Sequence, residues 1–337
     1  MTNRHTHHAQ GPLCISRRMG LTAALGAALA MLGAAPVGAQ TAFTKTITLV
    51  VPTAAGGGSD AVARTLAPIL SAALGQPVVV ENKLGAGGSI AATAVARAPA
   101  DGHTLLVGSS ATHGANPSLY KSLSYDPIKD FAPVVPIGSF LFGLVAHPSV
   151  PASGIKELVA YAKANPGKLT YAGVSSTSIV MTETMLRGAG VDVLKIPHRS
   201  AAIALPDLIA GRISMAVLDL ATGGPMVRDG KLRLLAITSR DRSSLFPDTP
   251  TISESVVPGF AVESWIGLFA PAQSPAALVE KMNAAVVAAL ARPEVKARFA
   301  SLSFDIRASS VGEFRDFVPK EIDKFTRLVR AAGIEAE

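Results

Sequence analysis

Three apolar segments in the first third of the chain each lead into a loop of glycines and small hydroxyl residues. The segments and their loops are 47–52 with TAAGGGSD at 53–60, 78–80 with a glycine loop at 85–89, and 104–107 with GSSATH at 108–113. Short runs rich in β-branched residues favour strands, and glycine lets the backbone turn tightly before a helix. The chain is therefore predicted to contain repeated strand–loop–helix units, which are typical of an α/β fold.

The loop at 53–60 is predicted to bind an anion. Its three consecutive glycines can turn backbone N–H groups outward, and Ser59 or Asp60 can cap the helix that follows. A helix N-terminus carries the positive end of the helix dipole and attracts carboxylates and phosphates. Ligands of open α/β sheets bind beyond the carboxyl ends of the strands, where all three loops would lie.

The same alternation resumes after a proline-punctuated stretch at 130–138. Strands are predicted at 141–146, 169–172, 193–196, 215–219, 232–238 and 262–270, and helices at 154–164, 181–188, 203–210, 275–291 and 311–332. Two such units in tandem predict two α/β lobes, each a mostly parallel sheet flanked by helices.

Residues 1–39 are predicted to be an export signal that is removed. Arg17 and Arg18 precede an apolar run at 19–35, and Val37-Gly38-Ala39 supplies the small residues of a cleavage site. The run is shorter than the roughly 20 apolar residues that span a membrane. The stretch at 16–21 resembles a twin-arginine signal, and an ordinary secretory signal fits nearly as well. The predicted location is the periplasm.

Composition excludes several classes of function. With 49% hydrophobic and 16% charged residues, the 337-residue chain can bury a large core. Removing residues 1–39 takes away three arginines and no acid, so the formal net charge falls from +7 to +4. The basic residues are scattered and aromatic residues make up only 5%, which disfavours nucleic acid as a partner. The remaining histidines lack metal-ligand spacing, so no metal is predicted. No cofactor is predicted either.

A nucleotide-dependent enzyme is the less favoured alternative. Residues 56–61 (GGGSDA) fit the G-x-G-x-x-A pattern, and Glu81 ends the next strand at about the distance of a ribose contact. Asp60, however, would place a carboxylate where pyrophosphate must bind. A hydrolase is weaker still, because residues 108–112 lack the closing glycine of a nucleophile elbow. No catalytic residue is predicted.

The order of motifs resembles the Bug family, the extracytoplasmic solute receptors of tripartite tricarboxylate transport systems. The matching motifs, spread over about 46–333, are VVP with GGGSD at 50–60, GQPVVVEN at 75–82, GAGG at 85–88, DGHTLL at 101–106, NPSLY at 116–120, YDP at 125–127, PGKL at 166–169 and SWIGL at 264–268. The resemblance implies a two-lobed periplasmic binding protein of the Venus-flytrap, type II-like kind. Lobe 1 would comprise residues 40–137 and 249–337, and lobe 2 residues 138–248.

The resemblance also implies a function. The chain would be a periplasmic solute-binding protein, not an enzyme, that captures a small organic carboxylate for a tripartite tricarboxylate-type transporter. Its partners would be the ligand and the membrane subunits of that transporter, and it would act as a monomer. A ligand-sensing receptor for a membrane signalling partner stays open as the alternative.

Residues from both lobes are predicted to bind the ligand. They are Thr53, Ala54, Ala55, Gly58, Ser59, Asp60, Ser109, Ser110 and Thr112 in lobe 1, and Ser176, Thr177, Ser178, Arg199, Ser200 and Asp219 in lobe 2. In lobe 2 the chain departs from the family pattern, with GVSSTSI at 173–179 in place of a loop ending in histidine and PHRS at 197–200 in place of PYKG.

Two of these residues have an alternative interpretation. Arg199 suits a second carboxylate because its guanidinium is a planar fork of donors, but it can equally be a solvated loop residue. Asp219 can accept a hydrogen bond from a ligand amine or hydroxyl, or can cap the helix that follows it.

Overall fold

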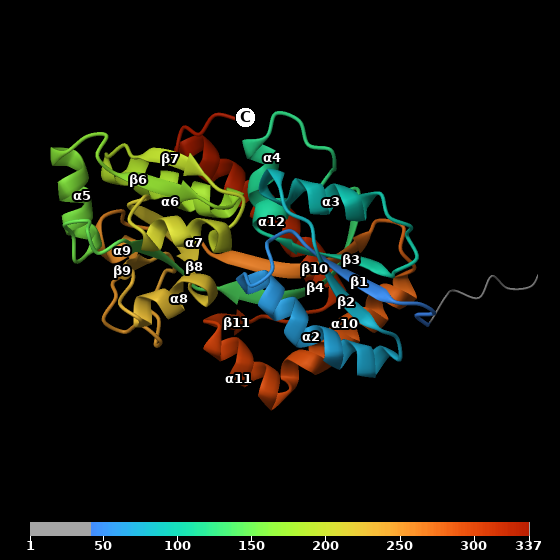
Figure 1. The fold of residues 1–337 in the computed structure, drawn as a ribbon. Helices are drawn as coiled ribbons and strands as arrows, with labels where there is room; N and C mark the ends of the chain where they lie inside the picture. Colours follow the sequence, from blue (N-terminus) through green and yellow to red (C-terminus); the bar gives the residue numbers. More distant parts are fainter. Residues whose placement is uncertain (1–41, 337) are drawn as a thin grey trace, which may run out of the picture. The chain divides into compact units, whose positions relative to one another are not determined.

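The computed structural model describes residues 42–336, and the predicted export signal lies outside them. Six strands form the first sheet, in the order β11-β4-β10-β3-β1-β2 (Figure 1). Their bounds are β1 Ile47–Val51, β2 Val78–Asn82, β3 Thr104–Ser109, β4 Phe131–Phe140, β10 Ser264–Pro271 and β11 Phe304–Ile306. β1 pairs in parallel with β2 and β3, so Leu49 lies opposite both Val80 and Leu105. β10 pairs antiparallel with β3 and β4, and β11 antiparallel with β4.

Five strands form the second sheet, in the order β7-β6-β8-β5-β9. Their bounds are β5 Phe142–Ala146, β6 Thr170–Gly173, β7 Leu194–Pro197, β8 Met215–Asp219 and β9 Arg233–Ile237. β6 is parallel to β7 and β8, while β5 is antiparallel to β8 and β9. Below, "first lobe" and "second lobe" mean the two sheets with the helices that flank them. The predicted residue boundaries of the lobes stay a prediction.

The predicted α/β class with two helix-flanked sheets is confirmed, but both sheets are mixed rather than mostly parallel. The reason is the crossing between them. β4 carries the chain out of the first sheet and continues after Leu141 as β5, while β10 brings the chain back. A strand that returns must run against the strand that left, so β10 lies antiparallel between β3 and β4. The parallel pairs are confined to the strand–loop–helix units that the sequence pattern predicted.

Helices cover both sheets (Figure 1). Those that flank the first sheet are α2 Gly58–Leu74, α3 Ser89–Ala96, α10 Ala276–Ala291, α11 Pro293–Ser301 and α12 Val311–Ala331. Those of the second are α5 Ile155–Ala164, α6 Ser176–Ala189, α7 Ala201–Ile209 and α8 Leu220–Arg228, and the short ones are η1 Ala86–Gly88, η2 Ala111–Ala115, α4 Asn116–Leu119 and α9 Ile252–Ser255. In α12, Phe314, Val318, Phe325 and Val329 are buried at helical spacing, so one face joins the core.

Candidate functional site

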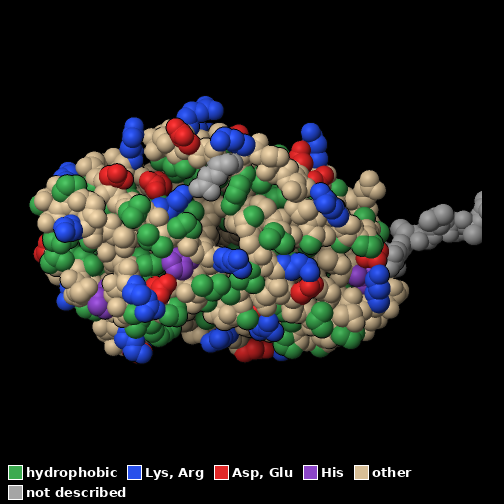
Figure 2. Space-filling view, turned by 45° about the horizontal axis from the view of Figure 1, so that its top comes forward, with side chains coloured by type: hydrophobic (Ala, Val, Ile, Leu, Met, Phe, Trp, Pro, Cys, Tyr) green, Lys and Arg blue, Asp and Glu red, His purple; other side chains and the backbone are tan. Residues whose placement is uncertain are grey.

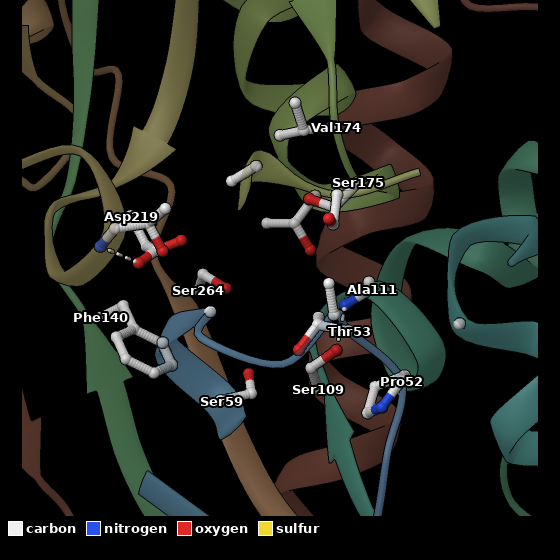
Figure 3. A pocket seen from close by; sticks show the side chains of 18 of the residues that line it. Pro52, Thr53, Ser59, Ser109, Ala111, Phe140, Val174, Ser175, Asp219 and Ser264 are labelled. Carbon is white, nitrogen blue, oxygen red and sulfur yellow. Dashed lines mark hydrogen bonds between the residues drawn. The ribbon is translucent and has the colours of Figure 1, made fainter. Parts of the chain in front are cut away.

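A pocket lies between the loops of the first lobe and the helix N-termini of the second (Figure 3). Its cavity volume is about 90 Å³, which suits a small molecule. The first lobe contributes Pro52, Thr53, Ala54, Gly57, Gly58, Ser59, Gly87, Gly88, Ser109, Ala111, Phe140, Ser264 and Ile266. The second lobe contributes Phe142, Val174, Ser175, Thr177, Arg199, Ser200, Ala201, Ala202, Asp219 and Thr222.

The wall of the first lobe centres on the start of α2. Gly57 precedes this helix in an extended conformation, and no side chain caps the first turn. The first N–H groups of a helix have no partner within the helix. At Gly58 a Cβ atom would lie 2.8 Å from Phe140 Cε1 and 2.9 Å from Asp219 Oδ1, so only glycine allows this close approach. The backbone of α2 therefore forms the floor of the pocket without side chains in between.

Asp60 supports this wall and does not line the pocket. Its buried carboxylate accepts hydrogen bonds from Gly56 N–H at 3.0 Å, from Arg64 Nε at 2.9 and 3.0 Å, and from Asn82 Nδ2 at 3.0 Å. Asn82 Nδ2 also donates to Thr53 O at 2.9 Å. Burial acts to raise the pKa of Asp60, but the hydrogen bonds from Arg64, Gly56 and Asn82 outweigh it and hold that pKa below its usual value. The loop at 53–60 is thus tied to β2.

Of the three predicted hydroxyl residues at the end of β3 and in the turn that follows, Ser109, Ser110 and Thr112, only Ser109 lines the pocket. Thr112 Oγ1 accepts the Ser109 N–H at 2.9 Å and contacts His113 Nδ1 at 2.9 Å, so it braces the turn. Ser110 Oγ lies 2.9 Å from Thr177 Oγ1 and 3.1 Å from Ser264 Oγ, and all three residues are buried. This chain of hydroxyls joins the first lobe to the start of α6 in the second.

The serine-rich segment of the second lobe is the start of a helix. This corrects the sequence prediction, which places residues 173–180 in a loop and begins the helix at 181. α6 starts at Ser176, and Ser175 is its N-cap, accepting the Ser178 N–H at 3.1 Å. Ser175 and Thr177 line the pocket. Ser178 Oγ instead donates to Val217 O at 2.7 Å, within the second lobe. Ser176 lies against Gly87, and a Cβ atom added to Gly87 would collide with the Ser176 hydroxyl.

Asp219 and Ser200 also cap helices that start at the pocket. Asp219 Oδ1 accepts the Thr222 N–H at 2.8 Å, at the start of α8, and Ser200 Oγ accepts the Ile203 N–H at 3.4 Å, at the start of α7. Burial raises the pKa of Asp219, and hydrogen bonds from Thr222 oppose this only in part. Arg199 is exposed at the pocket, and within residues 42–336 its side chain has no ion pair or hydrogen bond.

Nine of the fifteen predicted residues line the pocket. They are Thr53, Ala54, Gly58, Ser59, Ser109, Thr177, Arg199, Ser200 and Asp219. Ala55, Asp60, Ser110, Thr112, Ser176 and Ser178 lie outside the lining. Sequence reasoning missed Phe140, Phe142 and Ser264, because these come from the crossing strands, whose position follows from tertiary structure. Gly87 and Gly88 belong to the second glycine loop, so that signal was available.

Three further observations concern the described residues as a whole. No helix in residues 42–336 combines the length and apolar character needed to cross a membrane. Over the same residues, no cluster of three or more His, Cys, Asp or Glu side chains is placed to hold a metal ion. On the face shown in Figure 2, lysines and arginines are scattered among acidic and apolar side chains rather than gathered into a patch.

Comparison with known proteins decides the family. Residues 62–334 match the model of the tripartite tricarboxylate transporter family receptor. The chain belongs to this family. Among its relatives, the protein BugT of Bordetella pertussis is 34% identical over 317 residues, covering 93% of this chain and 97% of BugT. A protein from the tcbD-tcbE intergenic region of Pseudomonas sp. strain P51 is 34% identical over 85% of this chain and 86% of its own length. The predicted resemblance to the Bug family is thus confirmed.

Solved structures of the family share the fold. Rpa4515 of R. palustris with adipate superposes with a TM-score of 0.85 at 32% identity, covering 87% of this chain and 99% of that one. MatC from Rhodopseudomonas palustris with bound malate superposes with a TM-score of 0.81 at 35% identity, covering 85% of this chain and 99% of MatC. The periplasmic binding protein BugD superposes with a TM-score of 0.84 at 32% identity, covering 88% of this chain and 100% of BugD. These relatives are solute-binding receptors, so the prediction that the chain is not an enzyme is confirmed.

Proposed function

We propose that this receptor binds a small organic carboxylate in the periplasm, in the pocket between its lobes, and delivers it as a monomer to the membrane subunits of a tripartite tricarboxylate-type transporter. The observation that carries the proposal is the start of α2, which opens into the pocket with no side-chain cap. The adipate and malate in the related structures are carboxylates, which supports this class of ligand.

The wall of the first lobe has the chemistry that a carboxylate needs. The N-terminus of α2 supplies N–H donors and a partial positive charge, which stabilises an anion by about 0.3–1 kcal/mol at exposed sites and up to about 2 kcal/mol where partly buried. Thr53 Oγ1, on the same wall, is buried and has no hydrogen-bond partner in the described part of the chain. Ser59 and Ser109 add hydroxyls. A carboxylate would satisfy these donors without a buried lysine.

The second lobe would complete the site when the lobes close. Ser175 and Asp219 face the first lobe across the cavity (Figure 3). Thr177 and Ser200 of the same lobe also line the pocket. A ligand that touches both walls binds the closed form more tightly than the open form, and so shifts the population toward closure. The closed form is the conformation that the membrane subunits of the transporter would recognise.

The test is thermal melting of the protein purified from a periplasmic fraction, with a panel of mono-, di- and tricarboxylates, amino acids, aromatic acids and NAD. Ligand at 100 times its dissociation constant stabilises the folded state by about 2.7 kcal/mol, which shifts the melting temperature by a few degrees. A selective shift with carboxylates is the expected result. A shift with NAD alone would favour the nucleotide-dependent alternative, and absence of the protein from the periplasmic fraction would refute the location.

A further inference from the structure

Asp219 brings a negative charge into a pocket that we propose binds an anion. It ends β8, caps α8 and lies against the first lobe, with Oδ1 2.9 Å from the Cβ position of Gly58. A carboxylate at this point repels a ligand carboxylate bound at the start of α2. The charge of Asp219 therefore disfavours binding of the proposed ligand unless the ligand also donates a hydrogen bond to Asp219.

Capping a helix does not explain the charge. Three helices of the second lobe start at the pocket, and α6 and α7 are capped by the neutral hydroxyls of Ser175 and Ser200. Serine, threonine and asparagine cap helices about as well as aspartate, and the cap of α8 needs only one carboxylate oxygen. Of the three caps, only Asp219 is acidic.

No cation in residues 42–336 forms an ion pair with Asp219. Phe140 and Gly58 face it from the first lobe, and Thr222 faces it from α8. Arg199 lines the same pocket, but it is exposed and forms no ion pair with any of the described residues. Burial raises the pKa of Asp219, which is the sign of a carboxylate that lacks a counter-charge. A ligand that supplies a donor here relieves this penalty.

We infer that Asp219 determines specificity by accepting a hydrogen bond from a hydroxyl or ammonium group of the ligand. The pocket then selects hydroxy- or amino-carboxylates over carboxylates without such a donor. Because Asp219 lies against the first residue of α2, the donor sits close to the carboxylate that α2 binds. The inference rests on the proposed function and adds the ligand's second polar group.

The experiment is isothermal titration calorimetry of the periplasmic protein with matched ligands. Each series keeps the carbon chain and changes one group: succinate, malate and aspartate; glutarate, 2-hydroxyglutarate and glutamate; butyrate, 3-hydroxybutyrate and 3-aminobutyrate. Both enantiomers are titrated where they exist. A site built around a hydrogen bond rejects analogues that lack the group strongly, so we expect a preference of at least about tenfold for a donor-bearing ligand in one or more series. The hydroxy and amino arms distinguish the two donors.

The decisive variant is Asp219→Asn. Asparagine keeps an oxygen that can cap α8 and has nearly the same volume, but it replaces the second acceptor oxygen with an N–H donor. The preference should disappear or reverse toward the unsubstituted acid. Asp229→Asn is the matched control, because it removes the same charge at the other end of α8, where Asp229 is exposed and outside the pocket lining. A ligand-free melt confirms that both variants fold.

The outcomes separate the two proposals. A donor preference that Asp219→Asn removes and Asp229→Asn leaves intact supports the inference. Carboxylate binding with less than about a tenfold preference in every series, or with a preference that Asp219→Asn leaves unchanged, overturns the inference alone. Failure of every carboxylate in these series and in the melting panel overturns the proposed function and the inference with it.

Discussion

The two walls of the pocket are built differently. The first lobe presents backbone, at the start of α2, and ties it down from behind through Asp60, Arg64 and Asn82. The second lobe presents side chains that cap helices, Ser175, Ser200 and Asp219. Every substitution except one to proline leaves the backbone N–H group in place, whereas a capping residue can be exchanged for another with little loss of stability. The difference suggests that the first-lobe wall binds the carboxylate that all ligands share, while the second-lobe wall distinguishes between ligands.

The largest effect is expected from Gly58→Val in the first wall. A Cβ atom there already meets Phe140 and Asp219, so a branched side chain should prevent closure and weaken every carboxylate at least about 100-fold, or about 2.7 kcal/mol. Calorimetry measures the effect. Gly312→Ala is the control, because a Cβ at that position meets nothing within 4 Å. Loss of only one ligand class would show that the first wall also discriminates.

The next effect is expected from Asp60→Ala, which removes the carboxylate that accepts hydrogen bonds from Arg64 and Asn82, while Arg64 and Asn82 keep the hydrogen bond to each other. Removing one member of a hydrogen-bonded charge pair should lower the free energy of unfolding by about 1–3 kcal/mol. We expect a value in the lower part of this range, because Arg64 is half exposed and solvent screens its charge. All ligands should weaken together, because the loop and not a selective contact is disturbed. Chemical denaturation and calorimetry measure both effects, and a change in ligand preference would contradict the assignment of Asp60 as a support.

Asp60 also gives a prediction for pH. Its folded-state pKa lies below the usual 3.8, so its contribution to stability is present above that pH and is lost as the pH falls through the folded-state pKa. The Asp60→Ala variant should therefore lose less stability than the native protein on acidification from pH 5 to pH 3, within the range where such carboxylates titrate. Denaturation at a series of pH values checks this. Parallel curves for the two proteins would refute it.

A smaller effect is expected from Thr177→Val, in the hydroxyl chain between the lobes. Valine keeps the shape but removes the hydrogen bond to Ser110. This should destabilise the closed form by about 1 kcal/mol and lower the affinity for all ligands about fivefold. Ligand preference should stay the same. Calorimetry with the matched ligands measures this, and Thr170→Val is the control in the same lobe, outside the pocket lining.

The smallest effect is expected from Arg199→Ala. Arg199 is exposed, so an ion pair with a second ligand carboxylate is worth at most about 1 kcal/mol. Dicarboxylates should weaken up to about fivefold, and monocarboxylates should keep their affinity. Equal affinities before and after the change would remove Arg199 from the site and leave selection to the capping residues.

Local sequence predicted the first wall better than the second. Residues 47–60 contain a strand, a glycine turn and a helix start in one continuous segment, so their pattern indicated both the fold and the site. Residues 175–178 resemble a loop by composition, yet Ser175 caps a helix. Phe140, Phe142 and Ser264 reach the pocket because two strands cross between the lobes. No local pattern encodes that crossing, and it also explains why the sheets are mixed.

The crossing strands have a consequence for the order in which the chain becomes structured. All strands of the second sheet lie between Phe142 and Ile237, so this lobe can form from one continuous stretch. In the first lobe, Ser109 of β3 pairs with Ile266 of β10, which lies much later in the chain. Pairing between distant segments is slow, and a chain that emerges N-terminus first completes its segments in sequence order. The lobe that begins the chain is therefore the last to be finished, and until then β3 has an open edge.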